Sequence, residues 1–212
     1  EYRWLCQQLG FPHQPWNMTI GLSEQSHQRA QNIVEHDIRA PFIVLCPFTT
    51  RPQKHWIDEH WRELITKLSD AGIKTVMLGG PADAEHAQAL VSGLAVINLT
   101  GRTSLQEASA LIALSSGLIG VDTGLTHMGH AHRKPTLAIF GSTRPYQRGD
   151  HQTSLILYEA MPCAPCKRNP TCNNRFDCMR AISADQVIAQ FMTIYKRLSL
   201  IHISEPTRPG HI

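Results

Sequence analysis

Short apolar runs alternate with amphipathic segments along the chain from residue 41 onward. The apolar runs cover residues 42–46, 75–78, 95–99, 118–121, 136–140 and 154–158. Each is four or five residues long, and several are rich in β-branched side chains. Runs of this length and composition are typical of strands that are buried on both faces of a sheet. We therefore predict one strand in each run.

The segments between these runs have helical periodicity. Residues 58–70 place Trp61, Leu64, Ile65 and Leu68 on one face of a helix. Further helices are predicted over residues 23–38, 82–91, 104–115, 125–133 and 183–198. The regular alternation of strand and helix predicts an α/β fold with a doubly wound, mostly parallel, Rossmann-like sheet.

Composition and charge restrict the class of protein. The chain has 212 residues, of which 42% are apolar and 17% charged, with a formal net charge of +3. This weak charge, without a basic cluster, argues against a nucleic-acid partner. No apolar run approaches the roughly 18–20 residues that cross a bilayer, and we find no signal peptide, so we expect a soluble, cytoplasmic protein with no transmembrane segment. Because the first residue is Glu1 rather than Met, we also expect a piece of a longer protein.

Candidate chemistry follows the first predicted strand. An open parallel sheet binds ligands beyond the carboxyl ends of its strands, so the residues at these ends are the first candidates. Thr49 and Thr50 come shortly after the strand, and Lys54 lies four residues later. Two short hydroxyl donors and a nearby cation suit the oxygens of a phosphate group. The alternative is a solvated loop with a threonine turn, since the glycines of a P-loop are missing here.

A carboxylate and a helix start follow the fourth predicted strand. Asp122 stands at the strand end, and Thr123 and Gly124 lead into a helix that carries His127. The N–H groups at a helix start favour a diphosphate, and Asp122 has the acceptors that sugar hydroxyls need. The alternative is that Asp122 merely caps the helix.

Two further groups of polar residues have competing interpretations. Asp83 follows a tight turn after the second strand and is placed to approach a ribose hydroxyl. His127, His130 and His132 resemble a metal triplet, but in a helix His132 points about 200° away from His130. We therefore reject a metal site there and predict a packing or surface role for His130 and His132.

Four of the six cysteines fall within residues 163–178, which we call the cysteine loop. They are Cys163, Cys166, Cys172 and Cys178. In a reducing compartment, clustered thiols are read as metal ligands or free thiols before disulfides. Four thiolates suit a tetrahedral structural zinc ion, which would have no open position for catalysis. We predict such a zinc site, with free thiols as the alternative.

Three segments in this order, TTRPQKHW, VDTGLTH and PTLAIFGSTRPY, resemble those of the glycosyltransferase family 9 heptosyltransferases. The resemblance covers about residues 40–198, and CAPCKRNPTC is similar to a cysteine loop of some members. It implies an inverting enzyme of lipopolysaccharide inner-core assembly that takes heptose from ADP-heptose and requires no cofactor for catalysis. It also implies a GT-B architecture of two Rossmann-like domains, of which this chain would be the C-terminal one.

The resemblance also implies a role for each part of the chain. Residues 1–40 would form an interdomain connector with one helix, and residues 41–198 the nucleotide-sugar donor-binding domain. The ADP-heptose donor would contact Thr49, Thr50, Lys54, Asp83, Asp122, Thr123, Gly124 and His127. The general base and the groove for the lipopolysaccharide core or lipid A acceptor would belong to a missing N-terminal domain, so we expect no catalytic residue here. The place of work would be the cytoplasm, with peripheral association at the inner membrane.

Residues 199–212 lack periodicity and contain two prolines, and their sequence resembles a translated sequencing adaptor. We interpret them as a non-native tail. A second hypothesis for the whole chain is a non-catalytic nucleotide- or zinc-binding module in which the cysteine loop does the binding. Binding of ADP that survives Cys→Ser changes would favour the transferase.

Overall fold

The computed structural model describes residues 2–11, 18–39, 41–145 and 153–203, and this part of the chain contains a six-stranded parallel sheet. The strands are β1 (Phe42–Cys46), β2 (Lys74–Met77), β3 (Ile97–Asn98), β4 (Gly117–Val121), β5 (Thr136–Phe140) and β6 (Ser154–Tyr158). Their order across the sheet is β3-β2-β1-β4-β5-β6, and every neighbouring pair is parallel. The chain therefore winds outward in both directions from the central pair β1 and β4, as in a doubly wound Rossmann-like sheet.

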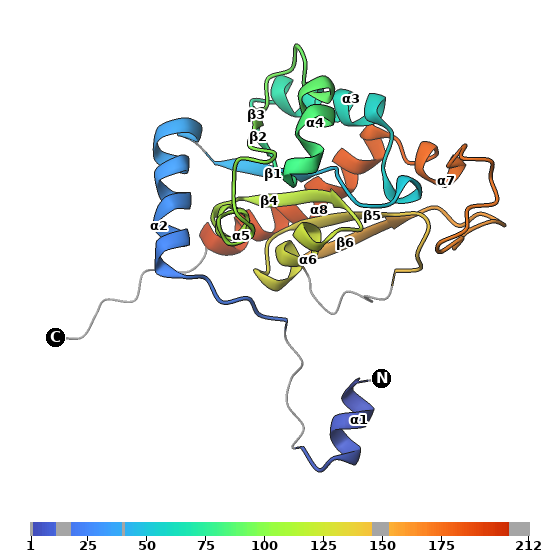
Figure 1. The fold of residues 1–212 in the computed structure, drawn as a ribbon. Coiled ribbons are helices and arrows are strands. Elements are labelled where there is room, and N and C mark those ends of the chain that lie inside the picture. Colours follow the sequence, from blue (N-terminus) through green and yellow to red (C-terminus); the bar gives the residue numbers. More distant parts are fainter. Residues whose placement is uncertain (1, 12–17, 40, 146–152, 204–212) are drawn as a thin grey trace.

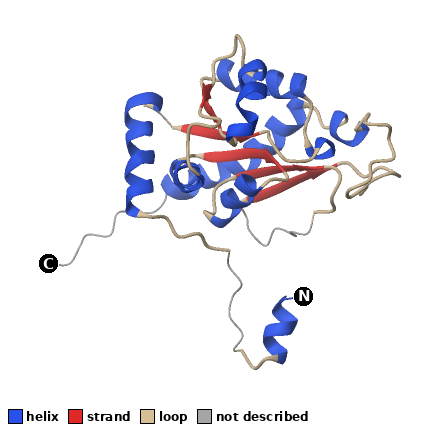
Figure 2. Cartoon of the chain, in the orientation of Figure 1, coloured by secondary structure: helices blue, strands red, loops and turns tan. Residues whose placement is uncertain are grey.

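The described residues also form eight α-helices, of which the third to the sixth connect successive strands. They are α1 (Tyr2–Gln8), α2 (Glu24–Ile33), α3 (Asp58–Asp70), α4 (Ala84–Leu90), α5 (Leu105–Leu114), α6 (Gly124–Ala131), α7 (Asp177–Arg180) and α8 (Ala184–Ile203). Three shorter helical turns are η1 (Val34–Ile38), η2 (Pro52–Lys54) and η3 (Pro81–Asp83). Figure 1 shows α2 to α6 and α8 on either side of the sheet, and Figure 2 shows the strands lying between these helices.

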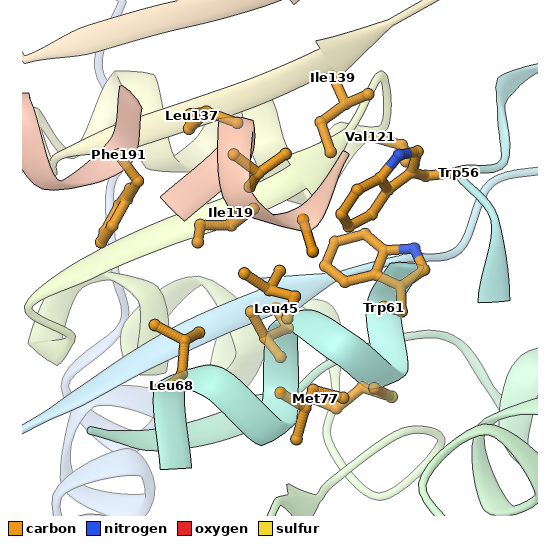
Figure 3. Close-up of a cluster of buried hydrophobic side chains, with 14 of the residues drawn as sticks. Leu45, Trp56, Trp61, Leu68, Met77, Ile119, Val121, Leu137, Ile139 and Phe191 are labelled. Atoms are coloured by element: carbon orange, nitrogen blue, oxygen red, sulfur yellow. The ribbon is translucent and has the colours of Figure 1, made fainter. Parts of the chain in front are cut away.

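The sheet buries both of its faces, as the apolar strand runs predicted. Alternate residues of β1 belong to different clusters: Ile43 and Leu45 to one, Val44 and Cys46 to the other. The first cluster includes side chains of α3, α4 and α8, and the second includes those of α2 and α5. Figure 3 shows the first cluster, where the tryptophans before and within α3 lie beside the strands. Two helical layers thus cover the sheet and leave its strand ends accessible to ligands.

The predicted elements agree well with those of the structure. β1, β5, β6 and α3 begin and end at the predicted residues, and α5 begins with a capping box between Ser104 and Glu107. The third strand was predicted over residues 95–99 but covers Ile97–Asn98, because it pairs with β2 alone at the edge of the sheet. The helix predicted over residues 82–91 begins as the 3₁₀ turn η3 at Pro81.

The two ends of the chain differ from the prediction. α1 adds a helix to the single one predicted for residues 1–40. α8 continues to Ile203, so residues 199–203 of the predicted tail are helical, since no proline interrupts the helix before Pro206. The remainder of that tail, residues 204–212, lies outside the described residues. Among the residues described, none of the helices combines the length and hydrophobicity that a membrane crossing requires.

Candidate nucleotide-sugar site

The candidate site lies at the carboxyl ends of β1 and β4, where the two halves of the sheet diverge. These strands are neighbours, with Cys46 in register with Gly120. The connection after β1 leads to β2 on one side, and the connection after β4 leads to β5 on the other. Open α/β sheets bind ligands in the crevice that forms at such a switch point. The residues of the two connections are therefore brought together by the topology.

The connection after β1 is anchored by buried side chains. Phe48 is 5% exposed, and the Trp56 ring, 1% exposed, donates a hydrogen bond from Nε1 to the carbonyl oxygen of Ile182 at 2.8 Å. Between them, η2 contains Pro52 at its start and Lys54 at its end. The loop between these anchors is therefore held against the domain.

The connection after β4 turns directly into α6. Thr123, rather than Asp122, is the residue at the N-cap position, and its side chain makes no capping hydrogen bond. The interpretation of Asp122 as a helix cap is therefore wrong. A side chain added at Gly124 would meet nothing within 4 Å, which shows that the start of α6 faces open space. The helix start is consequently accessible to a ligand.

The Asp122 carboxylate is the centre of a hydrogen-bond network. Its Oδ2 accepts hydrogen bonds from Lys54 Nζ at 2.5 Å and from Thr143 Oγ1 at 2.7 Å, and its Oδ1 lies 3.4 Å from His127 Nε2. Burial by itself would raise the pKa of Asp122, but the bonds from His127, Lys54 and Thr143 outweigh it and hold the pKa far below the usual range. Asp122 is therefore a fixed, ionised acceptor at neutral pH.

All eight predicted donor-binding residues line one pocket of about 650 Å³. They are Thr49, Thr50, Lys54, Asp83, Asp122, Thr123, Gly124 and His127, joined by Phe48 and Ala82. This volume falls within the roughly 300–1,000 Å³ typical of small-molecule sites. A second cavity of about 310 Å³ shares Phe48, Asp83, Thr123 and Gly124 with the first. The remaining lining of this second cavity comes from residues 79–81, 103–105, Ala108 and Leu125.

Asp83 has a local partner in addition to its place on the pocket wall. Its Oδ2 accepts a hydrogen bond from the backbone N–H of Gly80 at 2.9 Å, which closes the turn η3. The side chain is half-buried and reaches both cavities. The turn thus uses Oδ2 of Asp83, and its bond to Gly80 does not involve Oδ1.

Thr143 was missed as a site residue from the sequence. It lies within the segment PTLAIFGSTRPY, two residues beyond Gly141, and follows β5. Its hydroxyl donates to the same Asp122 oxygen that Lys54 contacts. The available signal was its position after the carboxyl end of β5. Because β5 pairs in parallel with β4, the carboxyl ends of these two strands lie side by side.

The predicted zinc site is not formed. Among the residues that the structure describes, no three His, Cys, Asp or Glu side chains are grouped to hold a metal ion. The thiols of Cys163, Cys166, Cys172 and Cys178 are free. Cys178 is buried in the hydrophobic cluster, where its Sγ packs toward Gly141. Cys178 is thus buried in the core, whereas Cys163, Cys166 and Cys172 are only partly buried.

The packing role predicted for two of the histidines is confirmed. His130 is 4% exposed and its Nδ1 lies 2.7 Å from Ser154 Oγ at the start of β6. His132 Nε2 lies 2.9 Å from Ser109 Oγ on α5, and burial, with the nearby Lys134 charge, lowers the pKa of His132. Only His127 of this group lines the pocket.

Comparison with solved structures places the fold among heptosyltransferases. The chain is similar to a family 9 glycosyltransferase of Veillonella parvula, with a TM-score of 0.77, 25% identity, and coverage of 91% of this chain and 58% of that one. It is also similar to Escherichia coli heptosyltransferase WaaC with ADP-2-deoxy-2-fluoro heptose, with a TM-score of 0.59, 28% identity, and coverage of 89% and 52%. The similarity thus extends over about half of each solved chain.

Sequence relatives agree with this placement. Lipopolysaccharide heptosyltransferase 1 of Pseudomonas aeruginosa is 34% identical over 144 residues, 67% of this chain and 40% of that protein. The Escherichia coli K12 enzyme of the same name is 33% identical over 134 residues, 60% of this chain and 42% of that protein. The chain therefore spans about two fifths of the length of these curated relatives. The sequence model of glycosyltransferase family 9 (heptosyltransferase) matches residues 2–176, and the chain belongs to this family.

Proposed function

We propose that this chain is the donor-binding part of an inverting heptosyltransferase and that it binds ADP-heptose for transfer to the lipopolysaccharide inner core. The observation that carries the proposal is the meeting of Lys54, Asp122 and the start of α6 in one pocket at the switch point. These three elements offer a cation, an ionised acceptor and free backbone donors. A sugar attached to a diphosphate presents the complementary groups.

The diphosphate is assigned to the side of the pocket formed by Thr49, Thr50, Lys54 and the α6 start. Hydroxyl and ammonium donors bind phosphate oxygens, and the partial positive charge of a helix start adds to this field. During heptose transfer, negative charge develops on the leaving ADP. Donors fixed in place before the reaction stabilise such charge most effectively, and they supply a large part of the rate acceleration in many enzymes.

The heptose is assigned to Asp122. Its carboxylate is ionised and only 7% exposed. The hydrogen bonds that it accepts hold it in one orientation, whereas a carboxylate in bulk solvent would be free to rotate. Sugar hydroxyls donate well to such an acceptor. His127, 3.4 Å from Asp122 Oδ1, is placed to contact the same sugar. The adjoining smaller cavity, with Leu105, Ala108 and Leu125 on its wall, suits the adenine base.

The rest of the reaction belongs to groups outside this site. Inversion at the anomeric carbon requires an acceptor hydroxyl to attack opposite the leaving diphosphate and to lose its proton to a base. We assign that base and the acceptor groove for lipopolysaccharide core or lipid A to an N-terminal domain. Residues 41–198 then act as the donor domain and residues 1–40 as the connector, at the cytoplasmic face of the inner membrane.

Calorimetry with ADP and with ADP-heptose tests the proposal. The 212-residue chain should bind both ligands, and the intact donor should bind more tightly because it alone reaches Asp122 with its sugar. The chain alone should transfer no heptose to a core acceptor. Turnover by the isolated chain would contradict the assignment of the base to another domain. An absence of any ADP binding would contradict the donor site itself.

The second hypothesis is a non-catalytic nucleotide- or zinc-binding module. Its zinc-binding form has no support in the structure, since the described residues contain no group of metal ligands. A nucleotide-binding module without transfer activity is distinguished by restoring a family 9 N-terminal domain to the chain. Transfer of heptose by the joined protein supports the enzyme. Tight ADP binding with no transfer supports the module.

A further inference from the structure

We propose that Gln53 is a positioning residue for Lys54 and that the main chain of the cysteine loop holds Gln53 in place. Gln53 lies in η2 directly before Lys54 and is 6% exposed. Its Nε2 donates a hydrogen bond to the carbonyl oxygen of Lys167 at 3.0 Å. A buried amide bonded to this main-chain acceptor orients the short turn on which Lys54 stands.

The Lys167 peptide also holds the other side of the pocket. Its backbone N–H donates to the carbonyl oxygen of Ser142 at 2.7 Å, and Ser142 is 1% exposed. The next residue, Thr143, donates to Asp122 Oδ2, the atom that Lys54 also contacts. Lys167 of the cysteine loop therefore connects the turn that carries Lys54 with the segment that carries Thr143. The side chains of both segments bond to Oδ2 of Asp122.

Close packing fixes the cysteine loop against the end of β5. A side chain at Gly141 would lie 2.5 Å from Met179 Sδ and 3.2 Å from Cys178 Sγ, so α7 rests directly on this glycine. Lys167 itself has a φ of 55°, in the left-handed region, which turns its N–H and carbonyl toward the two pocket segments. The loop thus has a mechanical role that requires no bound metal.

The expected consequence concerns affinity for a diphosphate and rests on the proposed function of Lys54. Without the Gln53 amide, η2 loses its bond to the loop, and Lys54 spends less time in the position that contacts a phosphate. A neutral hydrogen bond of this kind corresponds to about a three- to tenfold change in an equilibrium. Thermal stability alone does not report this effect.

The test compares Gln53→Met, which keeps the length of the side chain and removes the donor, with Gln88→Met at an exposed glutamine of α4. Calorimetry with ADP is run on the 212-residue chain well below the melting temperature of each variant. Gln53→Met should weaken ADP binding about three- to tenfold, and Gln88→Met should leave it unchanged. If Gln53→Met does not fold, Gln53→Asn replaces it, since the shorter amide cannot reach Lys167.

A double-mutant cycle separates positioning from general structural damage. In a Lys54→Ala background, the Gln53 substitution should cause no further loss of ADP affinity, because Gln53 acts through Lys54. Additive losses, or a lowered melting temperature with unchanged affinity, overturn the inference. If Lys54→Ala weakens ADP binding while Gln53→Met does not, the inference fails and the proposed function stands. If the unmodified chain binds no ADP, both fail.

Discussion

Lys54 Nζ lies 2.5 Å from Asp122 Oδ2, although the two residues follow different strands and are separated by 68 positions in the sequence. Lys54 is 17% exposed and Asp122 is 7% exposed, so the ion pair is partly shielded from water. A phosphate ligand that approaches Lys54 therefore meets a cation already paired with a carboxylate. The ion pair holds the Lys54 side chain at the wall of the pocket.

The first prediction concerns Lys54. Lys54→Ala should weaken ADP binding by about 1.5–3 kcal/mol, the range for hydrogen bonds to charged groups. Calorimetry at fixed salt measures the change, and Lys196→Ala, at an exposed lysine of α8, is the matched control. Equal ADP affinities for Lys54→Ala and the unmodified chain would remove Lys54 from the diphosphate site.

The second prediction concerns Asp122. Asp122→Ala should reduce affinity for ADP-heptose by about 1.5–3 kcal/mol, because it removes an ionised acceptor of sugar hydroxyls. Affinity for ADP should stay the same or rise, since Lys54 is released from its ion pair. Parallel titrations with the two ligands give the comparison. Equal weakening of both ligands would end the assignment of Asp122 to the sugar.

The third prediction is a pH dependence of stability. The folded pKa of Asp122 lies far below its ordinary value of 3.8, so its ionised form stabilises the fold at neutral pH. This contribution is fully present above the unfolded pKa and is lost as the pH falls through 3.8 toward the folded pKa. The stability difference between the unmodified chain and Asp122→Asn, from urea unfolding, should stay the same well above pH 3.8 and shrink as the pH is lowered below 3.8. A difference that is constant with pH would contradict the network.

The fourth prediction uses two glycines near β4 as a matched pair. A side chain at Gly120 would lie 2.2 Å from Thr126 Oγ1 and 2.9 Å from Cys46 Cβ, whereas one at Gly124 would meet nothing within 4 Å. Gly120→Ala should destabilise the fold by roughly 1–3 kcal/mol through overpacking. Gly124→Ala should leave the melting temperature unchanged but weaken ADP binding, because the methyl group enters the pocket. The reverse pattern in thermal melts and calorimetry would contradict the site.

The fifth prediction concerns thiol reactivity. Burial raises the pKa of Cys46 strongly and, with the neighbouring thiols, that of Cys178, so both should react slowest with maleimide in the folded chain. The half-exposed Cys6, Cys163 and Cys172 should react faster than these two. Timed labelling followed by peptide mass spectrometry gives the order.

Metal analysis of protein purified under reducing conditions should show no stoichiometric zinc, and one zinc per chain would restore the metal site.

The sequence was sufficient for the sheet, the principal helices and the edge of the sheet at which the candidate pocket lies. Strands such as Phe42–Cys46 are short and apolar throughout, and helices such as Asp58–Asp70 bury one stripe. Both patterns follow from local geometry, which a sequence displays directly. The placement of Lys54 and Asp122 in one pocket also followed, because parallel strands end at the same edge.

Only the tertiary structure decided which partners these residues have. The cap interpretation of Asp122 and the zinc interpretation of the cysteine loop were both compatible with spacing along the chain. The fold excluded the first by placing Thr123 at the cap, and among the described residues it brings no three ligating side chains together for the second. The contacts of Thr143 and Gln53 join segments 21 and 114 residues apart. Such contacts depend on how strand ends and loops converge in space, and periodicity along the chain contains no information about that convergence.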